Sequence, residues 1–257
     1  MKIIRFIYKT RACWGIFEEN VIRFLKAEPY EKILATNKRV DPGEIELLAP
    51  GCPSKIILAG LNYRDHAEEL GMPIPIEPVI FLKPPTSVIA HRKNIIYPQG
   101  IGRLDYEGEL ALVIKKEARN IPQDKVNDYI LGYTCLNDVT ARDLQKKDGQ
   151  WTRSKSFDTF CPFGPYLETD IDPSCLKIRS YLNGKRVQDS DTSKFIFPVD
   201  YLVSFISRIM TLLPGDVIST GTPPGVGPMQ VNDKIEIEIE GIGNLINSVA
   251  AEKSPVK

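Results

Sequence analysis

Hydrophobic residues in this chain occur mostly in short runs bounded by glycine, proline or charged residues, a pattern typical of β-strands. The clearest run is residues 234–240, where isoleucine alternates strictly with charged residues and predicts a strand with one buried face. The pair Asn183-Gly184 fits a tight turn and predicts a hairpin around it. Other runs predict strands at residues 2–8, 13–17, 20–24, 56–59, 79–82, 109–114, 130–136, 176–182 and 185–187.

Two segments have helical spacing instead. Apolar residues between 199 and 213 recur on one side, with Pro198 near the start and Pro214 after the end. A shorter helix is predicted at residues 65–70, ended by Gly71. Because strands dominate and do not alternate regularly with helices, the pattern predicts a β-rich α+β fold rather than a doubly wound nucleotide-binding fold.

The turn-forming stretch from Ala49 to Pro53 interrupts the strand pattern. It predicts a small N-terminal β-rich domain at residues 1–52 and a larger domain at residues 53–257. The N-terminal part is too small for an extensive core of its own, so we expect it to pack on the rest.

Composition narrows the classes of function. The 257 residues contain 33 lysines and arginines and 33 aspartates and glutamates, a balance that argues against a nucleic-acid partner. No stretch approaches the roughly 18 apolar residues of a membrane span. The five cysteines are odd in number and no two have C-x-x-C spacing, so neither a disulfide scaffold nor a structural zinc site is indicated. We therefore expect a soluble, cytoplasmic protein without a nucleic-acid or membrane partner.

Acidic residues near two predicted strands suggest a metal site. Glu107 and Glu109 are two residues apart at the start of a strand, so their side chains leave the same face. Such a pair suits a hard divalent cation, although it is also common on a solvated strand face. Asp138 ends another apolar strand and is followed by Arg142 and Gln145; Asp138 would equally serve as a helix N-cap.

A histidine–glutamate pair is the candidate for acid–base chemistry. His66 and Glu69 are three residues apart in a predicted helix, close enough for a hydrogen bond that would make the imidazole a better base. The same spacing also occurs in ordinary surface pairs. The chain has only two histidines, so few alternatives exist.

Two loops add candidate substrate contacts. Lys155 follows the charged segment 146–149, which could move as a flap. The Gly- and Pro-rich segment 219–227 follows a strand, and there Gly221 and Thr222 would offer a backbone N–H and a hydroxyl to an anion. Read as a generic turn, this segment would carry no function.

Taken in order, these pieces resemble the C-terminal catalytic domain of the fumarylacetoacetate hydrolase family over residues 54–249. The resemblance rests on five motifs: Asn62-Tyr-Arg-Asp-His66, Phe81-Leu-Lys-Pro84, Asp105-Tyr-Glu107-Gly-Glu109, Asn137-Asp138-Val-Thr-Ala-Arg142-Asp143 and Thr220-Gly-Thr222-Pro223. It implies a β-roll or mixed β-sandwich with few helices, one Mg²⁺ or Mn²⁺ per active site, and a homodimer.

The resemblance also implies roles for individual residues. Its metal ligands would be Glu107, Glu109 and Asp138. The pair His66 and Glu69 would be the acid–base group on a lid helix. A further set would contact the oxygens of the substrate, with Lys155 also catalytic: Lys155, Arg142, Gln145, Gly221 and Thr222.

The activity that follows is metal-dependent cleavage of a carbon–carbon bond beside a carbonyl in a small 2-oxo acid, as in an acylpyruvate hydrolase or oxaloacetate decarboxylase. It would proceed through a metal-bound enolate. An isomerase or tautomerase of 2-hydroxydienoate or oxaloacetate-like diacids is the alternative, because it uses the same intermediate. A catalytically silent binding protein on the same fold is a third hypothesis, and the intact set of site residues argues against it.

Overall fold

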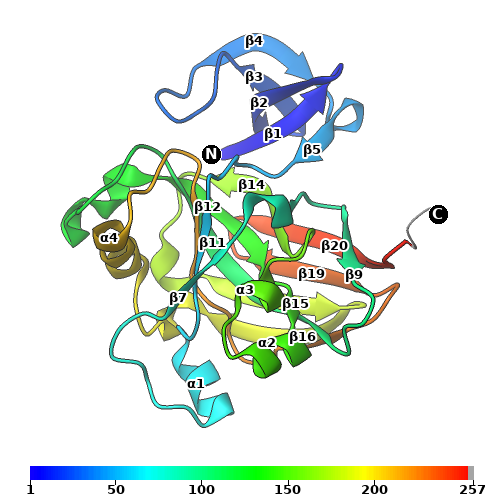
Figure 1. The fold of residues 1–257 in the computed structure, drawn as a ribbon. Coiled ribbons are helices and arrows are strands. Elements are labelled where there is room, and N and C mark those ends of the chain that lie inside the picture. Colours follow the sequence, from blue (N-terminus) through cyan, green and yellow to red (C-terminus); the bar gives the residue numbers. More distant parts are fainter. Residues whose placement is uncertain (254–257) are drawn as a thin grey trace.

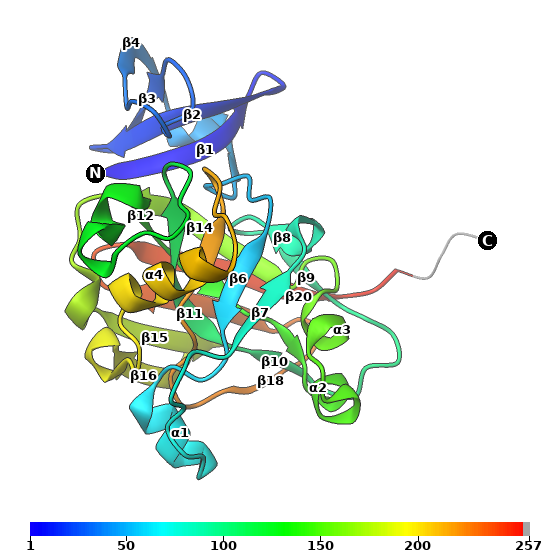
Figure 2. The same cartoon turned by 60° about the vertical axis from the view of Figure 1, so that its left-hand side comes forward.

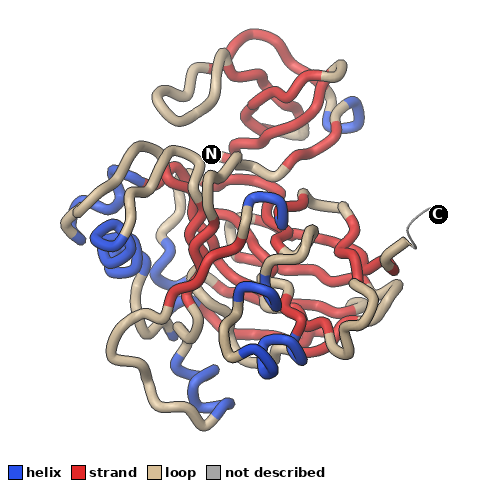
Figure 3. The backbone as a smooth tube through the Cα atoms, in the orientation of Figure 1, coloured by secondary structure: helices blue, strands red, loops and turns tan. Residues whose placement is uncertain are grey.

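The computed structural model describes residues 1–253 and consists mainly of β-strands, with few helices (Figure 3). Twelve strands form one large sheet, and ten of them lie in the order β4-β3-β2-β1-β14-β12-β11-β17-β6-β7. The strands of this sheet are β1 (Lys2–Tyr8), β2 (Arg11–Glu18), β3 (Val21–Leu25), β4 (Ala35–Val40), β5 (Glu46–Leu48), β6 (Ile56–Ala59), β7 (Ile80–Lys83), β8 (Val88–Ile89), β11 (Gly108–Ile114), β12 (Ile130–Asn137), β14 (Cys161–Glu168) and β17 (Val217–Ser219).

A second sheet packs against the central strands of the first. Its order is β16-β15-β19-β20-β9, and apolar side chains such as Leu110 of β11 and Ile237 of β19 belong to one buried core cluster. The five strands are β9 (Asn94–Tyr97), β15 (Lys177–Leu182), β16 (Lys185–Asp191), β19 (Lys234–Ile239) and β20 (Gly243–Ala251). A small third sheet contains β10 (Leu104–Tyr106), β13 (Thr140–Ala141) and β18 (Gly227–Met229). This arrangement confirms the predicted β-rich sandwich.

The N-terminal strands β1–β5 form a lobe of their own (Figures 1 and 2). This lobe is hydrogen-bonded to the larger part, because β1 pairs with β14 through Lys2 opposite Glu168 and Ile3 opposite Leu167. The last strand of the lobe is β5, which ends at Leu48, and the larger part of the chain follows it. Whether the two parts fold as separate domains divided at residue 52 stays a prediction.

The helices lie at the edges of the sheets (Figure 3). The α-helices are α1 (Arg64–Leu70), α2 (Arg142–Asp148), α3 (Thr152–Lys155) and α4 (Val199–Ile209), and the 3-10 turns are η1 (Pro42–Glu44), η2 (Pro85–Ser87), η3 (Gln123–Tyr129), η4 (Pro173–Cys175) and η5 (Thr192–Lys194). Among the residues that the structure describes, no helix has the length and apolar character that crossing a membrane would need.

Several local predictions are confirmed. The turn between β15 and β16 places Asn183 and Gly184 at φ of 52° and 80°, as the Asn-Gly pair requires. In β19, the three isoleucines are buried and alternate with more exposed residues. Helix α1 ends at Gly71, which adopts the left-handed conformation that glycine tolerates.

Two predicted boundaries are wrong. Helix α4 ends at Ile209 rather than near residue 213, because Leu212 leaves the helix to exchange backbone hydrogen bonds with Ala118. The segment 146–149 is not a free loop, because Lys146 to Asp148 form the last turn of α2. Their carbonyl and amide groups are therefore part of a helix rather than of a flap.

Candidate active site

Three acidic side chains converge where β11 and β12 lie side by side. Glu107 precedes β11, Glu109 is in β11, and Asp138 directly follows β12, with the Asp138 N–H donating to the Glu107 carbonyl at 2.8 Å. One carboxylate oxygen from each lies within 4.8 Å of the others, and all three residues are buried. The predicted convergence is present, and metal binding itself stays a prediction.

Glu109 shows why these residues fit a cation. Its Oε2 accepts hydrogen bonds from the Ser219 hydroxyl at 2.5 Å and the Gly221 N–H at 3.0 Å. Within residues 1–253, no basic side chain forms an ion pair with it. Burial raises the pKa of Glu109 well above its usual value, and the charges of Asp138 and Glu107 raise it further. An oxygen-only donor set with an uncompensated carboxylate suits a hard divalent cation such as Mg²⁺ or Mn²⁺.

Two buried lysines stand beside the carboxylates. Lys155, from α3, donates to Glu107 Oε2 at 2.9 Å and to Asp138 Oδ2 at 2.5 Å. Burial would lower the pKa of Lys155, but Asp138 and Glu107 outweigh that effect and raise it, so its amine is charged. Lys83, from β7, forms an ion pair with Asp138 and donates to the Val139 carbonyl at 3.1 Å. Lys83 is not among the site residues predicted from the sequence, although it belongs to one of the five motifs.

Arg142 and Asp105 form the next part of the site. The Arg142 Nε donates to Asp105 at 2.9 Å, one terminal nitrogen donates to Gln145 Oε1 at 2.6 Å, and the other pairs with Glu107. Burial would raise the pKa of Glu107, but Lys155 and Arg142 hold it below its ordinary value. Arg142 and Gln145 thus bond to each other, and their predicted contact with substrate stays a prediction.

His66 and Glu69 project from α1 and form the predicted hydrogen bond, with 2.8 Å between His66 Nδ1 and Glu69 Oε2. The other Glu69 oxygen accepts from the Gly225 N–H at 3.0 Å. A second contact, from the Ser190 hydroxyl to Asp65 at 2.6 Å, ties the start of α1 to β16. Because the carboxylate accepts from Nδ1, the second ring nitrogen, Nε2, is left as the base.

Gly221 and Thr222 form hydrogen bonds with other residues of the protein. The Gly221 N–H donates to Glu109, and the Thr222 hydroxyl donates to the Gly108 carbonyl at 3.0 Å and accepts from Gln188 at 2.9 Å. These bonds hold the 219–227 segment against β11. Direct contact of Gly221 and Thr222 with substrate stays a prediction.

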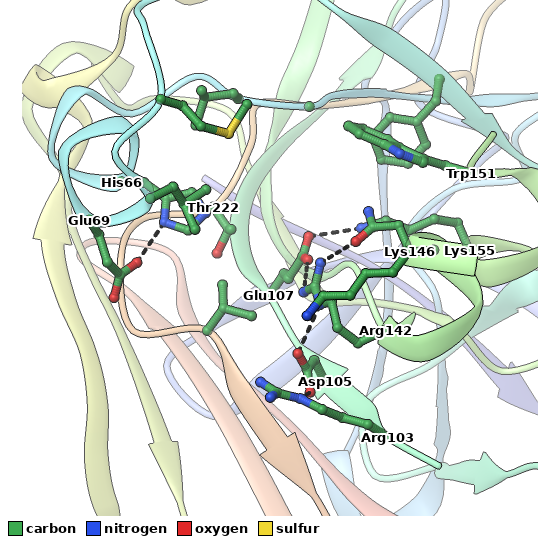
Figure 4. A pocket seen from close by; sticks show the side chains of 17 residues that line it. His66, Glu69, Arg103, Asp105, Glu107, Arg142, Lys146, Trp151, Lys155 and Thr222 are labelled. Atoms are coloured by element: carbon green, nitrogen blue, oxygen red, sulfur yellow. Dashed lines mark hydrogen bonds and ion pairs between the residues drawn. The ribbon is translucent and has the colours of Figure 1, made fainter. Parts of the chain in front are cut away.

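A cavity of about 500 Å³ joins these groups. His66 and Glu69 line one side and Lys155 and Arg142 the other, with Glu107 between them (Figure 4). Apolar side chains complete the wall: Leu61, Leu70, Met72, Phe81, Trp151 and Val226. Of the predicted site residues, Glu109, Asp138 and Gly221 lie outside this lining, although Glu109 and Asp138 are within 4.8 Å of Glu107.

The sequence of this chain matches two family models. Residues 55–250 match the fumarylacetoacetate (FAA) hydrolase C-terminal model, and residues 1–50 match the Rv2993c-like N-terminal model. The chain belongs to the fumarylacetoacetate hydrolase family.

Several relatives of the chain have the names of enzymes. Oxaloacetate tautomerase Fahd2a of Rattus norvegicus is 41% identical over 218 residues, which cover 80% of this chain and 70% of the relative. The crystal structure of 2-hydroxyhepta-2,4-diene-1,7-dioate isomerase from Mycobacterium marinum superposes with a TM-score of 0.92 at 40% identity, covering 99% and 100% of the two chains. Maleylpyruvate hydrolase from Sphingobium, in complex with manganese(II) and pyruvate, has a TM-score of 0.82 at 27% identity, covering 98% and 100%.

Proposed function

We propose that this protein is a Mg²⁺- or Mn²⁺-dependent enzyme that moves a proton between the keto and enol forms of a small 2-oxo dicarboxylate. The observation that carries the proposal is the cavity that the His66–Glu69 pair and Glu107 both line, with Glu109 and Asp138 buried within 4.8 Å of Glu107. A proton-transfer group on one side of the cavity and a cation site on the other are the two components that enolisation needs.

The contacts described above suggest a separate role for the carboxylates, for His66 and for Glu69. A divalent cation held by Glu107, Glu109 and Asp138 would act as a Lewis acid toward the oxygens of a 2-oxo acid. His66 Nε2 takes a proton from C3 of the substrate, the electrons of the broken C–H bond form the C2–C3 double bond, and the 2-oxo oxygen gains negative charge. Glu69 keeps the imidazole in the required tautomer and stabilises its charged form.

Lys155 supports the same step from the opposite side. Its ammonium is buried beside Glu107 and Asp138 and stays charged, so it stabilises negative charge on the substrate oxygen. Returning the proton to oxygen rather than to carbon completes a tautomerisation; returning it to a different carbon completes an isomerisation. Both reactions therefore use the same residues.

The charge of the site favours a dianionic substrate. Four carboxylates, Asp105, Glu107, Glu109 and Asp138, lie beside four cations: Lys83, Arg103, Arg142 and Lys155. Their charges cancel, so a bound dication leaves a net charge of +2 that a dicarboxylate would neutralise. Two relatives of about 40% identity have names that refer to dicarboxylates, oxaloacetate and a 1,7-dioate.

Cleavage of a carbon–carbon bond is the second candidate, in the form of acylpyruvate hydrolysis or oxaloacetate decarboxylation. It is favoured by the likeness to a maleylpyruvate hydrolase that holds manganese and pyruvate. In a hydrolysis, the His66–Glu69 pair would take a proton from the attacking water. In a decarboxylation no water attacks, so His66 would matter little.

The test is a substrate panel with purified protein and Mn²⁺ or Mg²⁺. Enol-oxaloacetate is followed by its ultraviolet absorbance, and pyruvate release is followed with oxaloacetate and acetylpyruvate. The proposal expects fast loss of the enol signal without matching pyruvate release, and expects EDTA to abolish it. Pyruvate release in step with substrate loss would favour the second candidate. Activity that survives EDTA would refute both.

A further inference from the structure

Two basic side chains in the cavity wall, Arg103 and Lys146, have no role in the chemistry described above. Lys146 is four residues after Arg142 on α2, so both project from the same side of that helix. Arg103 lies beside them, because the Arg142 N–H donates to the Arg103 carbonyl at 2.9 Å. Both side chains line the cavity on the side away from His66 and Glu69 (Figure 4).

These two residues form fewer hydrogen bonds and ion pairs with the protein than the other cations of the site. Arg103 donates from Nε to Asp105 at 2.7 Å, and this carboxylate is shared with Arg142. Its two terminal nitrogens make no hydrogen bond to residues 1–253. For Lys146, no carboxylate in the described part of the chain lies within 4 Å of the amine. Arg142, in contrast, bonds through all three of its nitrogens.

We propose that Arg103 and Lys146 form a subsite for the second carboxylate of the substrate, the one remote from the 2-oxo group. This inference deepens the proposed function and rests on it for the 2-oxo acid end of the molecule. A guanidinium with two free terminal nitrogens can bind a carboxylate through two parallel hydrogen bonds, and the lysine adds a mobile point charge. The subsite thereby selects 2-oxo diacids over 2-oxo monoacids.

The backbone around Arg103 is fixed before any substrate binds. The Gly102 N–H donates to the Asp143 side chain of α2 at 2.9 Å, and Leu104 pairs with Ala141 in the small third sheet. Asp105 holds the Nε edge of Arg103. The substrate therefore has to order only the end of the side chain, which keeps the entropic cost of binding low.

The test compares two ligands that differ only at the remote end: 2-oxoglutarate, which ends in a carboxylate, and 2-oxopentanoate, which ends in a methyl group. Their dissociation constants are measured by calorimetry with Mn²⁺ present, for the wild type and for Arg103→Gln and Lys146→Gln. The wild type should bind the diacid about 10–100-fold more tightly, the range expected for hydrogen bonds to charged groups. Each variant should lose most of that preference and keep its affinity for the monoacid within about twofold.

Lys147→Gln is the matched control, because Lys147 is the exposed neighbour of Lys146 and does not line the cavity. It should keep the wild-type preference. Lys146→Gln removes no side-chain hydrogen bond or ion pair within residues 1–253, so it remains informative even if Arg103→Gln disturbs Asp105. Equal wild-type affinity for the two ligands would overturn the inference, as would equal losses for both ligands in the variants. The proposed function fails separately, if oxaloacetate is neither tautomerised nor cleaved while the diacid preference is intact.

Discussion

Replacing Glu109 with glutamine should abolish divalent-cation binding without harming the fold. The amide oxygen of glutamine can still accept from the Ser219 hydroxyl and the Gly221 N–H, which are the contacts of the native carboxylate. Burial and the charges of Asp138 and Glu107 raise the pKa of Glu109, so they disfavour its ionised form, and a glutamine at this position carries no charge. Without metal, we therefore expect the variant to be at least as stable as the wild type.

The size of the effect can be worked out from the cluster. Three oxygens that lie within 4.8 Å of one another all lie within 4.8 Å divided by √3, about 2.8 Å, of a common point, and a further contraction reaches the roughly 2.1 Å of a Mg–oxygen bond. Changing a residue that only supports a ligand costs about 10–100-fold in metal affinity. The loss of the direct ligand Glu109 should therefore exceed about 100-fold.

The assay is thermal unfolding with and without Mn²⁺. At a free Mn²⁺ concentration of about 100 times Kd, the wild type gains about 2.7 kcal/mol. For a chain of this size that corresponds to a rise in Tm of roughly 5–10 °C. At the same concentration Glu109→Gln should gain less than about 0.4 kcal/mol, and its Tm should rise by less than about 2 °C.

Glu236→Gln is the control for the loss of a strand glutamate, because Glu236 lies in β19 and bonds to Asn244, away from the cluster. It should show the full Mn²⁺-dependent rise in Tm. A wild-type rise that Glu109→Gln retains would refute the assignment of Glu109 as a ligand. A wild type without any rise would refute the cation site as a whole.

Three further predictions concern other buried groups. His66→Gln should lower kcat by about 100-fold or more and leave the affinity for Mn²⁺ unchanged. The control His91→Gln should leave kcat unchanged. A loss of metal affinity in His66→Gln would contradict the proposal that His66 transfers the proton and does not bind the metal. Burial lowers the pKa of His91 to about 4, so the unfolded chain binds this proton more tightly and stability falls as pH drops below about 6.5. Between pH 7 and pH 5 the free energy of unfolding, measured in urea, should fall by roughly 1–2 kcal/mol less in His91→Gln than in the wild type. An equal fall in the two proteins would contradict this prediction. Lys83→Met should destabilise by about 3 kcal/mol, the lower end of the cost of breaking a buried ion pair, because Lys155 still pairs with Asp138. Lys93→Met should cost less than about 1 kcal/mol, and similar midpoints in urea would show that the buried Lys83–Asp138 pair contributes little.

The features that the sequence predicted well are set by local chemistry. Strict alternation defines the faces of β19 whatever the rest of the chain does, and Asn183-Gly184 specifies its turn through backbone conformation alone. The spacing of Glu107 and Glu109 likewise places both carboxylates on one side of β11.

The features that the sequence did not predict depend on residues far apart in the chain. Lys83, the last residue of β7, reaches Asp138 after β12 although three strands lie between β7 and β12 in the sheet. The end of α4 is set by the bridge between Leu212 and Ala118, which no local pattern contains. No pattern in the sequence predicted that Arg103 pairs with Asp105; Arg103 only lies two residues before the Asp105-Tyr-Glu107-Gly-Glu109 motif. The predicted homodimer and cytoplasmic location stay predictions.

The most direct test of the central claim is to locate Mn²⁺ by anomalous X-ray scattering in crystals grown with the ion. One strong peak should lie between Glu107, Glu109 and Asp138, about 2 Å from an oxygen of each, and facing the cavity that His66 lines. A peak bound elsewhere, or no peak among these three residues at saturating Mn²⁺, would contradict the account.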